Sequence, residues 1–94
     1  MLETVVLSES FLFFTDQGQY SGQYASSLSD FVQKLNGVPL KSVEFHWARG
    51  DFSKWIKDIF GDESLANRID QIDKSIKGEE LRNTIKRIVE KCTN

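Results

Sequence analysis

The sequence of 94 residues contains very few thiol and imidazole side chains, which bind zinc or form disulfides. It has one cysteine, Cys92, and one histidine, His46. One thiol cannot form a disulfide within the chain, and one thiol with one imidazole cannot complete a structural zinc site. These absences exclude a disulfide-stapled fold, and we predict neither a metal nor any other cofactor.

Long apolar stretches are also missing. The apolar run at residues 5–7 is too short for a signal peptide, and no basic segment precedes it. No stretch is apolar over the length that a transmembrane helix requires. We therefore expect a cytoplasmic protein without a membrane partner.

The chain has no excess of positive charge. Lys and Arg number 12 against 14 Asp and Glu, which gives a formal net charge of −2. A dedicated nucleic-acid binder needs a basic surface. The basic side chains that would share one face of a C-terminal helix are Arg82, Lys86, Arg87 and Lys91. Acidic residues dilute this stripe, so we interpret it as a solvated face, with weak nucleic-acid binding as an alternative.

Apolar residues are present in the amount that one small core needs. The hydrophobic fraction is 39% and the aromatic fraction is 12%. A chain of this length commonly folds alone around a modest core. There is no internal repeat and no long linker, so we predict a single domain over residues 1–94.

The N-terminal part predicts a β-hairpin over residues 11–25. Residues 11–15 form an aromatic run that favours a strand. Gly18 follows, where a tight turn needs a positive φ. Residues 19–25 then return as a second strand.

Three further features belong to this hairpin region. Tyr20 and Tyr24 lie on the second strand, and Gly22 marks a weak point or a bulge in it. Residues 5–7 are predicted as a third short strand.

The rest of the chain has helical periodicity and capping signals. The predicted helices cover residues 27–36, 39–48, 51–60, 62–74 and 79–92. Segment 39–48 is ambiguous, because its apolar residues also alternate as in a half-buried strand, and we favour the helix. The expected fold is therefore α+β, mainly α, with an N-terminal hairpin packed on a bundle of four or five short helices.

Helix ends and buried faces follow from particular residues. Ser27, Asp51 and Asp62 are predicted N-caps, and Gly37 is predicted to end the first helix in the left-handed conformation. The side chains that we expect the last helix to bury are Leu81, Ile85, Ile88, Val89 and Cys92.

A motif in the middle of the chain is similar to that of a known family. The pattern consists of Phe45-His46, Gly50-Asp51-Phe52, Trp55-Ile56, Gly61-Asp62-Glu63 and Leu65-Ala66. It resembles a family of small uncharacterised domains, found mainly in archaea and also in bacteria, over roughly residues 11 to 72. The resemblance implies a helical domain of unknown function that is sometimes fused to enzymes. It supplies no catalytic residues to carry over, and Gly50 stands where some relatives have Asn.

His46 is the side chain best suited to chemistry, since its ordinary pKa lies near neutrality. A base or a metal ligand needs partner groups that the local sequence does not display. We therefore favour a structural role, in which His46 bonds to a nearby cap such as Asp51. The alternative is a small-ligand sensor or enzyme that uses His46 with Asp51 or Glu44.

The leading functional hypothesis is a non-enzymatic module that binds another protein. Aromatic residues in irregular, polar surroundings are typical of interaction surfaces. The candidate surface consists of Tyr20, Tyr24, His46 and Trp47. For Trp47 the competing interpretation is that it covers the edge of the core.

Overall fold

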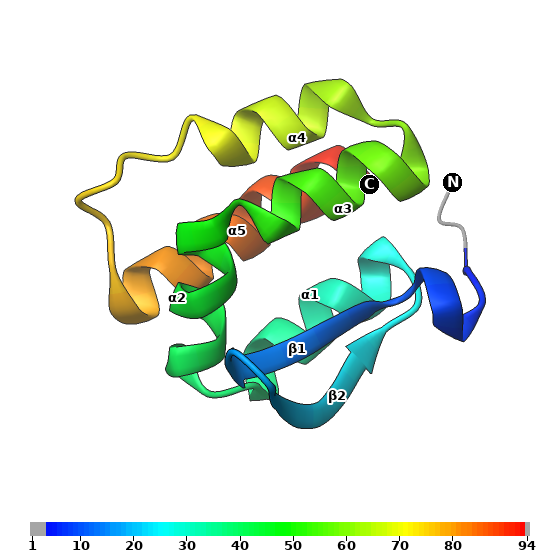
Figure 1. Ribbon diagram of the computed structural model, residues 1–94. Helices are drawn as coiled ribbons and strands as arrows, with labels where there is room; N and C mark the ends of the chain where they lie inside the picture. The colour runs from blue at the N-terminus through cyan, green and yellow to red at the C-terminus, as the bar shows by residue number, and fades with distance from the viewer. Residues whose placement is uncertain (1–3, 94) are drawn as a thin grey trace.

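The computed structural model describes residues 4–93, and it has a hairpin followed by five helices (Figure 1). The hairpin consists of β1 (Phe11–Asp16) and β2 (Gln19–Ala25). The helices are α1 (Leu28–Gly37), α2 (Leu40–Arg49), α3 (Asp51–Phe60), α4 (Glu63–Asp70) and α5 (Gly78–Thr93). The predicted α+β, mainly α fold is confirmed, and the ambiguous segment 39–48 is a helix.

The hairpin is antiparallel and contains the predicted bulge. Phe13 pairs with Gln23, whereas the next residue, Phe14, pairs with Tyr20. The two residues of β2 left between these pairs include Gly22, whose φ of +88° only glycine adopts easily. Because side chains alternate along a strand, Phe11 and Phe13 face the core and Leu12 faces outward.

The predicted third strand at residues 5–7 is wrong. A 3₁₀ helix, η1 (Leu7–Glu9), begins in this segment, because Glu9 N–H bonds back to the carbonyl of Val6 at 2.9 Å. A single backbone bond, from Val5 N–H to Ser26 O at 2.7 Å, ties the segment to the end of the hairpin.

Two of the predicted caps are confirmed. Ser27 Oγ accepts from Asp30 N–H at 3.0 Å at the start of α1, and Asp62 Oδ1 accepts from Leu65 N–H at 3.0 Å at the start of α4. Each bond satisfies an amide that the first turn of a helix leaves unpaired.

The prediction that Gly37 ends α1 in the left-handed conformation is wrong. Gly37 is the last helical residue and its φ is not positive. The helix ends because Val38 is extended, with φ −79° and ψ 152°. Val38 precedes Pro39, and a proline ring disfavours the helical conformation for the residue before it.

The predicted cap by Asp51 is also wrong. Gly50, with φ +73°, is both the C-cap of α2 and the N-cap of α3. Among residues 4–93, no side chain forms a capping hydrogen bond at the start of α3. Asp51 is the first residue of α3, and its carboxylate bonds to a side chain of α2.

One further helix boundary and one burial prediction differ from the structure. The helix predicted over 62–74 ends at Asp70, and in the segment that follows Asp73 Oδ1 accepts from Ser75 N–H at 2.9 Å and forms a turn. Cys92 is exposed, because the last turn of α5 extends past the core, to which this helix contributes buried residues only as far as Val89.

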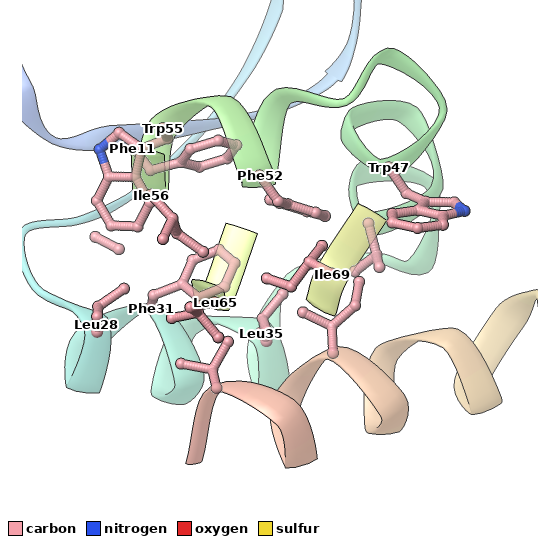
Figure 2. Close-up of a cluster of buried hydrophobic side chains, with 14 of the residues drawn as sticks. Phe11, Leu28, Phe31, Leu35, Trp47, Phe52, Trp55, Ile56, Leu65 and Ile69 are labelled. Carbon is pink, nitrogen blue, oxygen red and sulfur yellow. The ribbon is translucent and has the colours of Figure 1, made fainter. Parts of the chain in front are cut away.

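The core lies between the inner face of the hairpin and the helices. In Figure 1 the hairpin and α1 occupy the lower half of the view, with α3 and α4 in the upper half. Figure 2 shows their side chains converging in one cluster. Its aromatic part consists of Phe11, Phe13, Phe31, Phe52 and Trp55, with ring centroids 4.9 to 5.9 Å apart for the contacting pairs.

Candidate functional site

His46 lies where β1, α2 and α3 meet. It is only 4% exposed, and the ring of Phe11 packs against its imidazole at 4.7 Å between centroids. Burial follows from the helical spacing, because Val43, His46 and Trp47 share the inner face of α2.

Both ring nitrogens of His46 have a partner. The backbone N–H of Phe14 donates to Nε2 at 2.8 Å, and Nδ1 lies 2.8 Å from Asp51 Oδ2. An amide N–H can only donate, so Nε2 must be the unprotonated nitrogen. The proton therefore sits on Nδ1 and is donated to the Asp51 carboxylate, and His46 is neutral.

The surroundings of His46 act on its pKa in opposite directions. Burial lowers the pKa most strongly, the hydrogen bond and charge of Asp51 raise it, and Arg49 lowers it. The net effect is a pKa below the ordinary value of 6.5. This direction agrees with the Phe14 bond, which requires a lone pair on Nε2.

The close succession of α2 and α3 positions Asp51. The left-handed Gly50 joins the two helices with no further linker, so position 51 comes back beside position 46. Asp51 also lies at the N-terminal end of α3, where the helix dipole favours a negative charge. Arg49 Nε lies 3.4 Å from the same carboxylate oxygen, and its guanidinium is 5.0 Å from the centroid of the Phe45 ring.

An open cavity of about 300 Å³ lies beside this junction. Leu12 and Phe14 of the hairpin form one part of its lining, and Phe45 and Arg49 of α2 form another. His46 also lines the cavity, but its one acceptor nitrogen is already bonded to Phe14. In this arrangement the imidazole holds β1 on α2 and α3.

Glu44, the other predicted partner of His46, is not brought to it. Glu44 Oε2 accepts from Gly78 N–H at 2.9 Å, at the start of α5. Glu44 therefore caps a helix far along the sequence.

The structure does not bring the four predicted surface residues together on one exposed face. Tyr20 and Tyr24 are 47% and 42% exposed on β2. His46 is buried as described, and Trp47 is 8% exposed, with Lys74 Nζ 4.2 Å from the centroid of its ring. Trp47 thus covers the edge of the core, which was the competing interpretation.

Sequence reasoning missed two apolar residues next to the tyrosines. Leu12 is 38% exposed and pairs with Tyr24, and the half-buried Phe14 pairs with Tyr20. The signal was present in residues 11–14, which are apolar at both alternating positions. A hairpin with one solvated face normally alternates apolar with polar residues.

The prediction that Arg82 lies on a solvated stripe is wrong. Its guanidinium donates to two carbonyls at the end of α1, from Nη1 to Asn36 O at 3.2 Å and from Nη2 to Val38 O at 2.6 Å. Arg82 therefore satisfies backbone groups that the end of α1 leaves open.

The described residues form neither a metal-binding cluster nor a membrane-spanning helix. Within residues 4–93, no three His, Cys, Asp or Glu side chains are grouped so that they could hold a metal ion. None of the helices in the described part of the chain is both long and apolar enough to cross a membrane.

Comparison with known proteins identifies one family. No curated protein and no solved structure matches the chain. The model of a family of unknown function, DUF5752, matches residues 20–90, which include α1 to α4, most of α5 and the His46–Asp51 pair. The chain therefore belongs to the DUF5752 family of unknown function.

Proposed function

We propose that this chain is a non-enzymatic protein-interaction module, and that it binds its partner through the outer hairpin face. We use this name for the outward side of β1 and β2, formed by Leu12, Phe14, Tyr20 and Tyr24. The observation that carries the proposal is that two cross-strand pairs of large apolar or aromatic residues, Leu12 with Tyr24 and Phe14 with Tyr20, lie on the outward side of the hairpin.

The four side chains are contiguous. Leu12 is the cross-strand partner of Tyr24, and Phe14 is that of Tyr20. The rings of Phe14 and Tyr20 lie 5.4 Å apart. Contiguous exposed apolar residues with tyrosines among them are typical of protein contact surfaces.

The outer hairpin face is also held in place from behind. Phe11 and Phe13 bury the inner side of β1 in the core, and the Phe14 backbone is bonded to His46. A surface that is ordered before binding loses less conformational entropy when a partner docks.

The exposed area is modest, which bears on the kind of complex. A tyrosine side chain can bury roughly 200 Å² of surface. Nearly half of the surface of Tyr20 and of Tyr24 is exposed and so available to a partner. The face alone is therefore smaller than the roughly 800 Å² per partner of a standard interface. We expect a reversible complex in which the partner makes further contacts around this face.

The alternative of an enzyme or sensor that uses His46 as a base is less well supported. A general base needs a lone pair directed at the substrate. The one lone pair of His46 accepts the Phe14 N–H, and the carboxylate that would orient the ring also pairs with Arg49. Weak nucleic-acid binding along α5 is likewise less well supported, since Arg82 is engaged with α1.

The test is affinity capture from cells of the source organism, followed by measurement of the Kd of the captured partner. We expect Leu12→Ser and Tyr24→Ser each to weaken binding at least about tenfold, since central apolar contacts dominate such interfaces. Leu7→Ser is the matched control, because Leu7 is 63% exposed but lies on η1, outside the outer hairpin face.

The proposal fails if Leu12→Ser and Tyr24→Ser bind as tightly as the control, or if no stoichiometric partner is captured. Trp47→Ala is unsuitable for this experiment. Trp47 is buried, so its loss would weaken folding as well as any contact.

A further inference from the structure

A second open cavity, of about 420 Å³, lies between α2 and the segment that joins α4 to α5. It shares no lining residue with the cavity beside His46. Its size falls within the range of sites that bind small molecules in proteins. It is lined by Trp47, Ile76 and Leu81 and by the charged residues Glu44, Lys74 and Lys77, together with Ala48.

The apolar wall of this cavity is part of the core. Trp47 and Leu81 are buried residues of the core cluster, and Ile76 packs against that cluster. Figure 2 shows Trp47 at the edge of the cluster, with its indole nitrogen directed away from the other labelled side chains. The wall is therefore partly aromatic and fixed in position by the core.

The polar groups at the cavity are mainly donors without a protein acceptor. Neither Lys74 nor Lys77 forms an ion pair with any residue between 4 and 93, and Lys74 Nζ instead lies over the indole ring. Among these residues the indole N–H of Trp47 also has no hydrogen-bond acceptor. The one carboxylate in the lining, Glu44, is already bonded to Gly78 N–H.

This combination selects the chemistry of a ligand. A cation would be repelled by the two ammonium groups, and a compact inorganic anion would leave the apolar wall unfilled. A flat apolar group with a carboxylate matches both features. Its ring can pack against the indole, and its carboxylate can form charge-assisted hydrogen bonds to the lysines.

We propose that this cavity binds a small aromatic carboxylate, whose ring packs on Trp47, Ile76 and Leu81 and whose carboxylate lies between Lys74 and Lys77. Lys74 then exchanges its contact with the indole face for the carboxylate. The site is independent of the proposed protein-binding surface on the hairpin.

The experiment is a titration of the nitrogen-15-labelled full chain with 2-naphthoate, followed by NMR. The site predicts saturable shifts of backbone amides at Ile76, Lys77 and Leu81. The matched probe is 2-naphthamide, which has nearly the same shape without the charge, and it should bind at least about tenfold more weakly.

Substitutions of the two lysines test whether their charges account for the preference for the carboxylate. The double variant Lys74→Gln with Lys77→Gln should bind 2-naphthoate at least about tenfold more weakly than the unaltered chain does. Its affinities for 2-naphthoate and 2-naphthamide should then be equal. Lys57→Gln, an exposed lysine of α3, should bind like the unaltered chain. Thermal melts of all variants verify that they are folded.

Three results would each overturn the proposal. The first is the absence of saturation up to about 10 mM, well above the range of a specific site. The second is equal affinity for the acid and the amide. The third is a set of shifts centred on residues outside this cavity.

Discussion

At the scale of single residues, the key feature is the pair of hydrogen bonds that His46 makes through its two ring nitrogens. A lone histidine beside an aspartate and a cavity resembles part of a catalytic group. In the structure Phe14 N–H and Asp51 engage both ring nitrogens, and the bond from Phe14 N–H requires the neutral form. The imidazole joins a strand to two helices that are consecutive in sequence.

This arrangement predicts how stability depends on pH. The pKa of His46 is lowered in the folded state, mainly by burial, from its ordinary value of 6.5. The stability that neutral His46 contributes is therefore fully present above about pH 6.5. It is lost as the pH falls through the lowered pKa, because protonation of Nε2 removes the acceptor for Phe14 N–H.

The measurement is the free energy of unfolding in urea between pH 7.5 and pH 5, compared with that of His46→Gln, which does not titrate there. The natural chain should lose stability faster than the variant across this window. Equal slopes would contradict the prediction. Asp30 and Asp73 also have lowered pKa values, but from an ordinary value of 3.8, so their contributions are lost at lower pH.

At the scale of elements, the helices are positioned by bonds at their ends. α2 and α3 share Gly50, and Gly78 at the start of α5 is capped by Glu44 of α2. The end of α1 is held by Arg82 from α5. These contacts connect segments that are 34 and 44 residues apart in the chain.

Arg82→Leu should therefore destabilise the fold by about 2 kcal/mol, since it removes a charged donor from one partly buried carbonyl, Val38 O, and from one exposed carbonyl, Asn36 O. Arg82→Lys should recover only part of the loss, because an ammonium cannot reproduce the fork of the guanidinium. Urea unfolding of both variants measures the difference. Equal stability of Arg82→Leu and the natural chain would show that the bonds to α1 contribute little.

At the scale of the whole molecule, one aromatic cluster joins the hairpin to the helices. Trp55 packs against Phe11 and Phe31, and its indole N–H donates to Glu9 O at 2.8 Å. One side chain of α3 thus contacts the helix η1, the hairpin and α1 at the same time.

Trp55→Ala should cost about 3–5 kcal/mol of unfolding free energy, the usual cost of removing a large buried aromatic side chain. Trp55→Phe keeps most of the packing but loses the bond to Glu9, so we expect a smaller loss of about 1 kcal/mol. Thermal melts give the ranking. A Trp55→Ala protein that melts within a degree or so of the natural chain would contradict the assignment of Trp55 to the core.

The sequence predicted those parts of the fold that neighbouring residues determine. The caps at Ser27 and Asp62 act within three residues, and the bulge at Gly22 needs only a local conformation. The contacts of Arg82 with α1 and of His46 with Phe14 join residues 44 and 32 positions apart, and no local pattern specifies such partners. The exposed faces were predicted only in part for the same reason, because the burial of Trp47 depends on how α2 packs.

The central claim is that neutral His46 fastens the hairpin to the helices through its two ring nitrogens. The most direct test is a long-range proton–nitrogen correlation spectrum of the His46 imidazole at pH 7. The account predicts a single neutral tautomer with the proton on Nδ1 and an unprotonated, hydrogen-bonded Nε2. A proton on Nε2, a doubly protonated ring or a rapidly averaging mixture of tautomers would contradict it.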